Sequence, residues 1–134
     1  YPEAKKVDSH PSWPNPIQQP FIELQQFVIE NRQPVFIVMG CRMVLESVLK
    51  DLKGEGDDNF KRIDDLAKRG IITGSLKDWA HEIRKRGNDA AHDLNAGTPE
   101  EAAELVNFIK LLLHVCYELP EAIRDKRSAR PPSP

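Results

Sequence analysis

Apolar side chains recur along most of this chain at the three-to-four-residue spacing of α-helices, and no stretch shows the two-residue alternation of half-buried strands. Proline, glycine and asparagine separate the periodic segments and mark where helices begin and end. The pattern predicts helices over residues 20–31, 34–53, 60–69, 75–94 and 99–117, with a short last helix that opens at Pro120. The predicted fold class is all-α, a bundle of about five helices.

Two of the predicted helices are apolar around nearly their whole circumference. Between residues 35 and 49, the only positions outside the apolar set are Gly40, Arg42, Glu46 and Ser47. A helix of this kind is normally buried on several sides, so 34–53 is expected to be the central helix. Together with 99–117 it offers more apolar surface than short helices can cover, which predicts a homodimer. Arg42 and Glu46 lie four residues apart and can pair, either to brace two helices or to mark the rim of a site.

The two ends of the chain are rich in proline. Five of the first 20 residues are prolines, so residues 1–19 are expected to form an extended arm. The helical bundle is expected over 20–126, followed by a mobile, basic, proline-ending tail over 127–134. Trp13 is expected to anchor the arm on its own domain, although docking on a partner chain is the alternative. The chain begins without methionine, and we therefore expect it to be a fragment.

Composition narrows the class of protein. The 134 residues carry a net charge of -2, so any RNA contact must come from a local patch rather than from a strongly basic surface. Cys41 and Cys116 lie in apolar runs without disulfide or zinc spacing, which fits a reducing cytoplasm. No apolar run is long enough to span a membrane. The acidic loop 54–59 lacks both a calcium pattern and a phosphate-binding pattern, and no cofactor or metal is expected.

The chemistry-bearing residues gather in the stretch 83–92. On a continuous helix, His81, Arg84, Asn88 and His92 share an arc of roughly 80° at the border of the apolar face. Arg86 lies on the opposite border, and only a break at Gly87 would bring it to His92. Two arginines are therefore candidate partners of His92, and the continuity of the helix decides between them.

A purely structural interpretation of the same stretch is also open. Gly87, Ala90 and Ala91 are small residues on the apolar side, and small residues allow a second helix to approach closely. Asn88 and His92 could then be polar groups at the edge of that helix contact, hydrogen-bonded to backbone.

The stretch resembles the signature of a bacterial family, the domain of unknown function 4145, within the HEPN superfamily (higher eukaryotes and prokaryotes nucleotide-binding). The matching positions are Ile83, Arg84, Gly87, Asn88, Ala90, Ala91 and His92. Residues 41–46 resemble the arginine-to-glutamate helix of that family, and residues 117–120 resemble its last helix end. The resemblance implies an HEPN-like helical bundle. Members of the family often carry a zinc ribbon just upstream, so an attached module of that kind is expected as a partner.

The resemblance also implies a metal-independent endoribonuclease of a bacterial defence or toxin system. In HEPN ribonucleases an arginine and a histidine, separated by four to six residues and often contributed by a dimer, cleave RNA with the help of the ribose 2′-hydroxyl. His92 would move protons, and Arg84 or Arg86 would hold the phosphate. Asn88 would orient His92 or a phosphate oxygen, with His81, Arg42 and Glu46 in support. Five residues separate Arg86 from His92 and seven separate Arg84 from it, so only Arg86 has the active spacing. The alternative is a non-catalytic module that dimerises and binds nucleotide or nucleic acid for attached domains.

Overall fold

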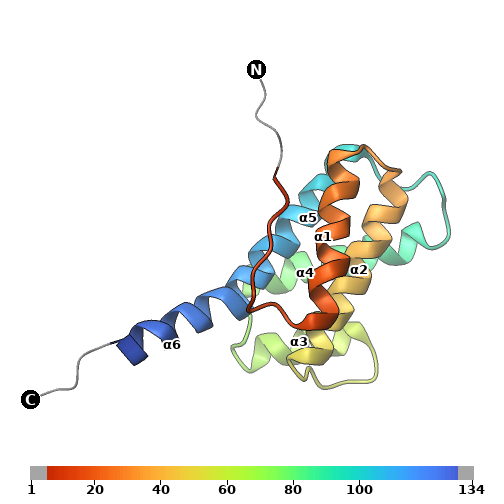
Figure 1. Ribbon diagram of the computed structural model, residues 1–134. Coiled ribbons are helices and arrows are strands. Elements are labelled where there is room, and N and C mark those ends of the chain that lie inside the picture. Colours follow the sequence, from red (N-terminus) through yellow and green to blue (C-terminus); the bar gives the residue numbers. More distant parts are fainter. Residues whose placement is uncertain (1–5, 130–134) are drawn as a thin grey trace, which may run out of the picture.

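The computed structural model describes residues 6–129, and within them every regular element is helical (Figure 1). The elements are α1 (Asn15–Ile29), α2 (Pro34–Asp51), α3 (Asn59–Lys68), α4 (Gly74–Ala90), α5 (Pro99–Leu113), a π-helical turn η1 (His114–Glu118) and α6 (Leu119–Ala129). The all-α prediction is confirmed.

The central position of α2 is also confirmed. It packs against α1, α3, α4 and α5, and it contributes more buried residues than any other described helix. Its buried residues are Val35, Ile37, Val38, Cys41, Val44, Leu45, Val48 and Leu49. Because these side chains leave α2 on several sides, one helix can organise a single core. Burial raises the pKa of the Cys41 thiol to about 12, as expected for a small core side chain.

The first helix begins five residues before the predicted position. Pro16 lies in the first turn of α1, where a missing N–H costs nothing, and Pro20 lies inside the helix. Pro20 has no N–H to donate to the backbone carbonyl one turn back in the helix. Because both prolines are exposed, water can donate to that carbonyl instead. The sequence pattern placed the start at the wrong proline.

The N-terminal arm lies against its own domain, as expected, but Trp13 is buried rather than docked on the surface, with 3% of its area exposed. Its ring packs edge-on against Phe21, and its Nε1–H donates to Glu118 of η1 at 2.9 Å. Farther along the arm, the Asp8 backbone exchanges two hydrogen bonds with the Gln25 side chain in α1. Residues 1–5 lie outside the described residues.

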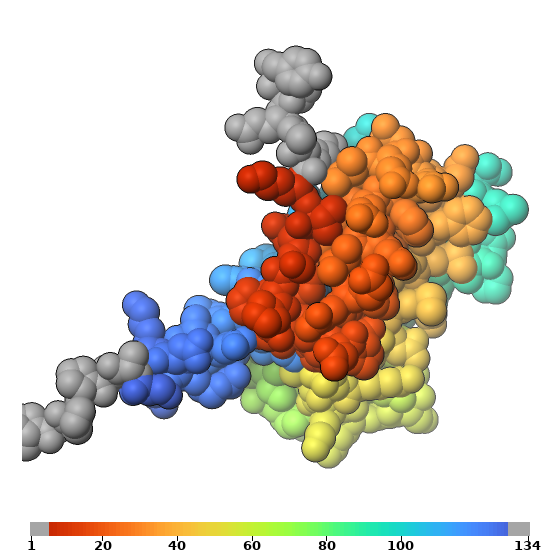
Figure 2. Space-filling view, in the orientation of Figure 1, coloured from red at the N-terminus to blue at the C-terminus, as the bar shows by residue number. Residues whose placement is uncertain are grey.

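The C-terminal helices form one long rod. α5 continues through η1 into α6 without an intervening loop, whereas the pattern predicted two separate helices. The Tyr117 hydroxyl donates to Asp51 at the end of α2 at 2.7 Å, and burial together with this carboxylate raises the pKa of Tyr117. Beyond this point α6 contacts no described helix except η1, and it stands away from the body (Figures 1 and 2). Part of the predicted tail is thus helical, while residues 130–134 lie outside the described residues.

Candidate functional site: one flank of helix α4

Helix α4 carries the signature and runs unbroken through Gly87. It is capped by Thr73, whose hydroxyl accepts from the Leu76 N–H at 3.3 Å, and it begins at Gly74, one residue before the predicted start. At Gly87 a Cβ would lie 2.5 Å from both Cβ and Cδ of Arg42 on α2. The absence of a side chain at Gly87 therefore serves close packing with α2, and the helix break considered from the sequence does not occur.

The helix ends at Ala90, earlier than its apolar stripe suggested. His92 lies two residues beyond the last helical residue, and its N–H donates to the Asp89 carbonyl at 3.1 Å in a turn. The Asp93 carboxylate then accepts from the Asn95 N–H, a local bond that competes with helix continuation. Leu94, the last residue of the predicted helix, is 73% exposed.

Arg84 is held in place by neighbours on two helices. Its Nε–H donates to His81 Nδ1 at 3.3 Å, and its guanidinium carbon lies 5.1 Å from the ring centre of Phe60 on α3. The other ring nitrogen of His81, Nε2, lies 2.9 Å from an Asp64 carboxylate oxygen. Both bonds are satisfied when His81 carries its proton on Nε2, so the chain Asp64–His81–Arg84 is complete with a neutral imidazole.

The members of this cluster that lie on α3 were missed from the sequence. Phe60 is 48% exposed, and its ring lies 4.8 Å from that of His81, centre to centre. The hydrogen bond from His81 is the largest cause of a lowered pKa at Asp64, with Lys77 at 3.6 Å as a weaker contributor. Only the packing of α3 on α4 brings these side chains together, and no spacing along the chain could have shown it.

Arg86 lies on the other flank of α4 and is paired with acids. Its Nε lies 3.3 Å from Glu82, one turn back, and its Nη1 lies 3.1 Å from Glu101 at the start of α5. Arg84 is likewise bonded to a residue one turn back, so both side chains turn toward the N-terminal end of α4, away from His92. Within residues 6–129, neither arginine makes a hydrogen bond or ion pair with His92.

Asn88 and His92 are exposed, and among the described residues neither side chain takes part in a hydrogen bond or ion pair. The interpretation of these two groups as polar edges of a packed helix contact is therefore wrong. The other half of that interpretation is right for Gly87 and Ala90, which are buried, and wrong for Ala91, which is exposed.

A family model for a domain of unknown function, DUF4145, matches residues 25–128, more than three quarters of the chain and the whole of the signature. The chain belongs to the DUF4145 family. Neither the curated proteins nor the solved structures include a match to this chain. The family carries no established activity, so the function of this DUF4145 domain has to be argued from its own side chains.

The supporting pair predicted in the central helix of this DUF4145 domain is arranged differently. The Glu46 carboxylate binds the Lys50 ammonium group, four residues on, at 3.2 Å. This hydrogen bond is the largest cause of the lowered pKa of Glu46, and Arg42 lowers it only through its charge. Glutamate before lysine is the favourable order for such a pair on a helix. The side-chain stem of Arg42 packs against Gly87. The Arg42 Nε is buried and has no hydrogen-bond partner among the described residues.

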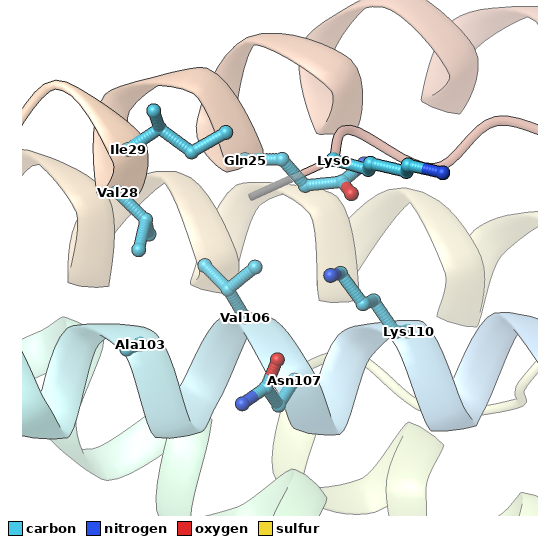
Figure 3. A pocket seen from close by; sticks show the side chains of 8 residues that line it. All are labelled: Lys6, Gln25, Val28, Ile29, Ala103, Val106, Asn107 and Lys110. Atoms are coloured by element: carbon cyan, nitrogen blue, oxygen red, sulfur yellow. The ribbon is translucent and has the colours of Figure 1, made fainter. Parts of the chain in front are cut away.

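Of the pockets of this DUF4145 domain, one of about 130 Å³ reaches the signature at Arg86 and Asp89, and others lie away from it. One of about 290 Å³ lies between α1 and α5, where Gln25, Val28, Val106 and Lys110 line it (Figure 3). Lys110 is paired with Asp8, and the Gln25 amide is fully used by the arm and α1. Residues 6–129 hold no cluster of three or more metal-ligating side chains, and none of their helices combines the length and apolar character of a membrane span.

Proposed function

We propose that this DUF4145 domain is a non-catalytic, HEPN-type module that binds single-stranded RNA on the flank of α4, for domains attached to it. Membership of the HEPN superfamily is part of the proposal, and it is supported by the seven matching residues between Ile83 and His92 and by the all-helical bundle. The observation that carries the proposal is the position of Arg84 between His81 and the exposed ring of Phe60.

Arg84 is suited to hold a phosphate. Its Nε is occupied by His81, while its terminal amino groups make no hydrogen bond to the described residues. The bond to His81 and the Phe60 ring fix the side chain in advance, so little rotamer entropy is lost when an anion binds. Arg86 is less suited, because the carboxylates of Glu82 and Glu101 already neutralise its charge.

Phe60 offers the second element of nucleic-acid recognition, an exposed aromatic face. Single-stranded nucleic acids bind where bases stack on aromatic rings beside cationic groups, with about 1–3 kcal/mol per stacked base. Asn88 lies one turn beyond Arg84 on α4 and His92 follows the end of the helix; both are exposed, and in this proposal they contact the next nucleotides. A chain whose net charge is -2 has no broad basic surface, and a site with so few cationic contacts agrees with that composition.

Cleavage is the second candidate, and the exposure of His92 is the observation that favours it. An imidazole open to solvent can exchange protons with a bound ribose hydroxyl. Both arginines of the same chain turn away from it, so the phosphate-holding guanidinium would have to come from a second copy. We therefore rank cleavage below binding.

Fluorescence anisotropy with a labelled single-stranded RNA of about ten nucleotides tests the proposal. Arg84→Ala should weaken binding at least tenfold, whereas Arg86→Ala, the matched arginine on the other flank, should change it less than twofold. Phe60→Ala should weaken binding by about five- to a hundredfold. The control is Leu111→Ala, a similarly exposed apolar residue on α5.

The salt dependence adds an independent measurement. For a single strand, each phosphate that a cationic side chain neutralises contributes about 0.7 to the slope of log affinity against log salt. Arg84→Ala should therefore lower the slope by that amount, and Phe60→Ala should leave it unchanged. Equal effects of Arg84→Ala and Arg86→Ala would refute the assignment of the site. A gel of the same RNA incubated in chelator would show fragments ending in a cyclic phosphate if the cleaving alternative were correct.

A further inference from the structure

An apolar groove runs between α1 and α2, on a part of the surface that the proposed RNA site does not use. It encloses about 400 Å³, and its apolar wall is formed mainly by Leu24, Phe27, Phe36, Met39, Met43 and Val44. Met43 is 65% exposed and Phe36 is more than half exposed, although both lie on the central helix. Among the described residues that line the groove, the single ionisable one is Glu23.

Helix α6 exposes an apolar stripe that no other part of the described chain covers. Leu119 and Ile123 lie four residues apart on one line of the helix, and Ile123 is 49% exposed. Arg127 is the next residue on this line, four residues farther on, and it is exposed. Because α6 packs only against η1, the stripe is presented on a helix that stands free of the body (Figure 2).

The groove and the stripe match in length, polarity and charge. The lining residues span Pro16 to Phe27 on α1 and Phe36 to Ser47 on α2, about 16 Å along each helix. The 11 residues of α6 also extend over about 16 Å. An amphipathic helix laid in a groove uses anchors at i and i+4, and here it would place a basic end, Arg127, opposite an acidic rim, Glu23.

We propose that α6 of one copy lies in the α1–α2 groove of a second copy, and that the exchange is reciprocal. The rod formed by α5, η1 and α6 carries the stripe away from α1 and α2 of its own chain, so the groove of another molecule is the one it can reach (Figure 1). In a two-fold dimer the helix–groove contact forms twice, once for each α6. A stable interface buries about 800 Å² of each partner, so both contacts are needed to reach that area.

Sedimentation equilibrium of the whole chain tests this proposal. The parent chain should form a dimer, and Ile123→Asp on the stripe and Met43→Asp in the groove should each weaken dimerisation at least tenfold. Leu94→Asp is the matched control, because Leu94 is a highly exposed apolar residue outside both surfaces, and it should leave the dimer intact. Circular dichroism of each variant should show an unchanged helical signal, since all three side chains are exposed.

Charge reversal then distinguishes this contact from other dimers. Glu23→Arg and Arg127→Glu should each weaken the dimer, and the two changes together should restore it. A parent chain that remains monomeric at about 0.1 mM, where a dimer of micromolar affinity would be almost fully formed, would overturn the proposal. A dimer that resists both Ile123→Asp and Met43→Asp would also overturn it, because the copies would then meet elsewhere.

Discussion

Gly87 shows how a signature residue can be explained by packing alone. Its missing side chain leaves the space that the stem of Arg42 fills, so α2 and α4 approach each other closely at this point. Glycine inside a helix costs about 1 kcal/mol relative to alanine, and here the close contact between two helices offsets that cost. The same contact buries the Arg42 Nε without a partner among the described residues, which makes the position still less tolerant of disturbance.

We expect Gly87→Ala to lower the free energy of unfolding by about 1–3 kcal/mol, because the new Cβ would overlap the Arg42 stem close to its own backbone. Gly74→Ala is the control. A Cβ at Gly74 meets nothing within 4 Å, so this change should be neutral or stabilise by up to about 1 kcal/mol. Urea unfolding followed by circular dichroism measures both. Equal stabilisation by the two alanines would show that α2 does not press on Gly87.

The carboxylate of Asp64 should make stability depend on pH. Its pKa is lowered in the folded state, chiefly by the hydrogen bond from His81, so its stabilising effect is complete above the unfolded pKa of about 3.9 and is lost as the pH falls through the lower folded pKa. The difference in unfolding free energy between the parent and Asp64→Asn should therefore be constant above about pH 5, roughly one unit over the unfolded pKa, and should shrink in more acidic solution.

A second background identifies the cause of this pH dependence. His81→Phe keeps a ring against Phe60 but removes the donor, so Asp64→Asn should have a much smaller pH-dependent effect in that background. An undiminished effect would assign the lowered pKa to Lys77 instead, whose ammonium group lies 3.6 Å away.

At the scale of the elements, α4 begins and ends where polar side chains bond to the backbone rather than where the apolar stripe begins and ends. Thr73 caps its first turn, and Asp93 bonds to the backbone just after its last turn. We expect Thr73→Ala to cost about 1 kcal/mol of stability, because one N–H of the first turn loses its acceptor. Ser75→Ala, two residues on, should change stability by less than about 0.5 kcal/mol. Thermal unfolding of both variants decides which residue is the cap.

The helices and the central position of α2 could be predicted, because both depend on apolar spacing within one segment. The start of α1 could not, since Pro16 and Pro20 are equally acceptable first-turn residues and only the burial of Ile17 favours the earlier one. The candidate site was predictable as far as it lies on α4, where Arg84 and His81 share a face. Phe60 and Asp64 were missed because they lie on α3. The spacing of residues along α3 or α4 does not determine the angle at which the two helices pack.

At the scale of the whole molecule, the N-terminal arm is part of the core. Trp13 fills space between α1 and η1, two elements that are distant in sequence, and its indole N–H is bonded to Glu118. The arm therefore closes the bundle on the side where α5 passes into α6. An extended, proline-rich segment can therefore be packed firmly against the rest of its domain.

Trp13→Ala should lower the free energy of unfolding by about 3–5 kcal/mol, the range for removing a large buried aromatic side chain. Trp13→Phe should cost less, because it keeps most of the apolar packing and loses only the bond to Glu118. Pro11→Ala, an exposed change in the same arm, should be nearly neutral. Denaturant unfolding measures the three variants. Equal free energies of unfolding for all three would mean that the arm is only loosely attached.

The π-helical turn η1 has a consequence for how this molecule can change over evolution. A π turn closes its hydrogen bonds over five residues instead of four, so it contains one residue more than an α-helix would use over the same stretch. Loss of a single residue there would restore α-helical winding over the same stretch, so α6 would face nearly the same direction as before. Loss of a single residue within the regular winding of α6 would instead turn everything beyond it around the rod axis by about 100°. The π turn is therefore the place in the rod where the number of residues can change by one while the outer helix keeps its direction.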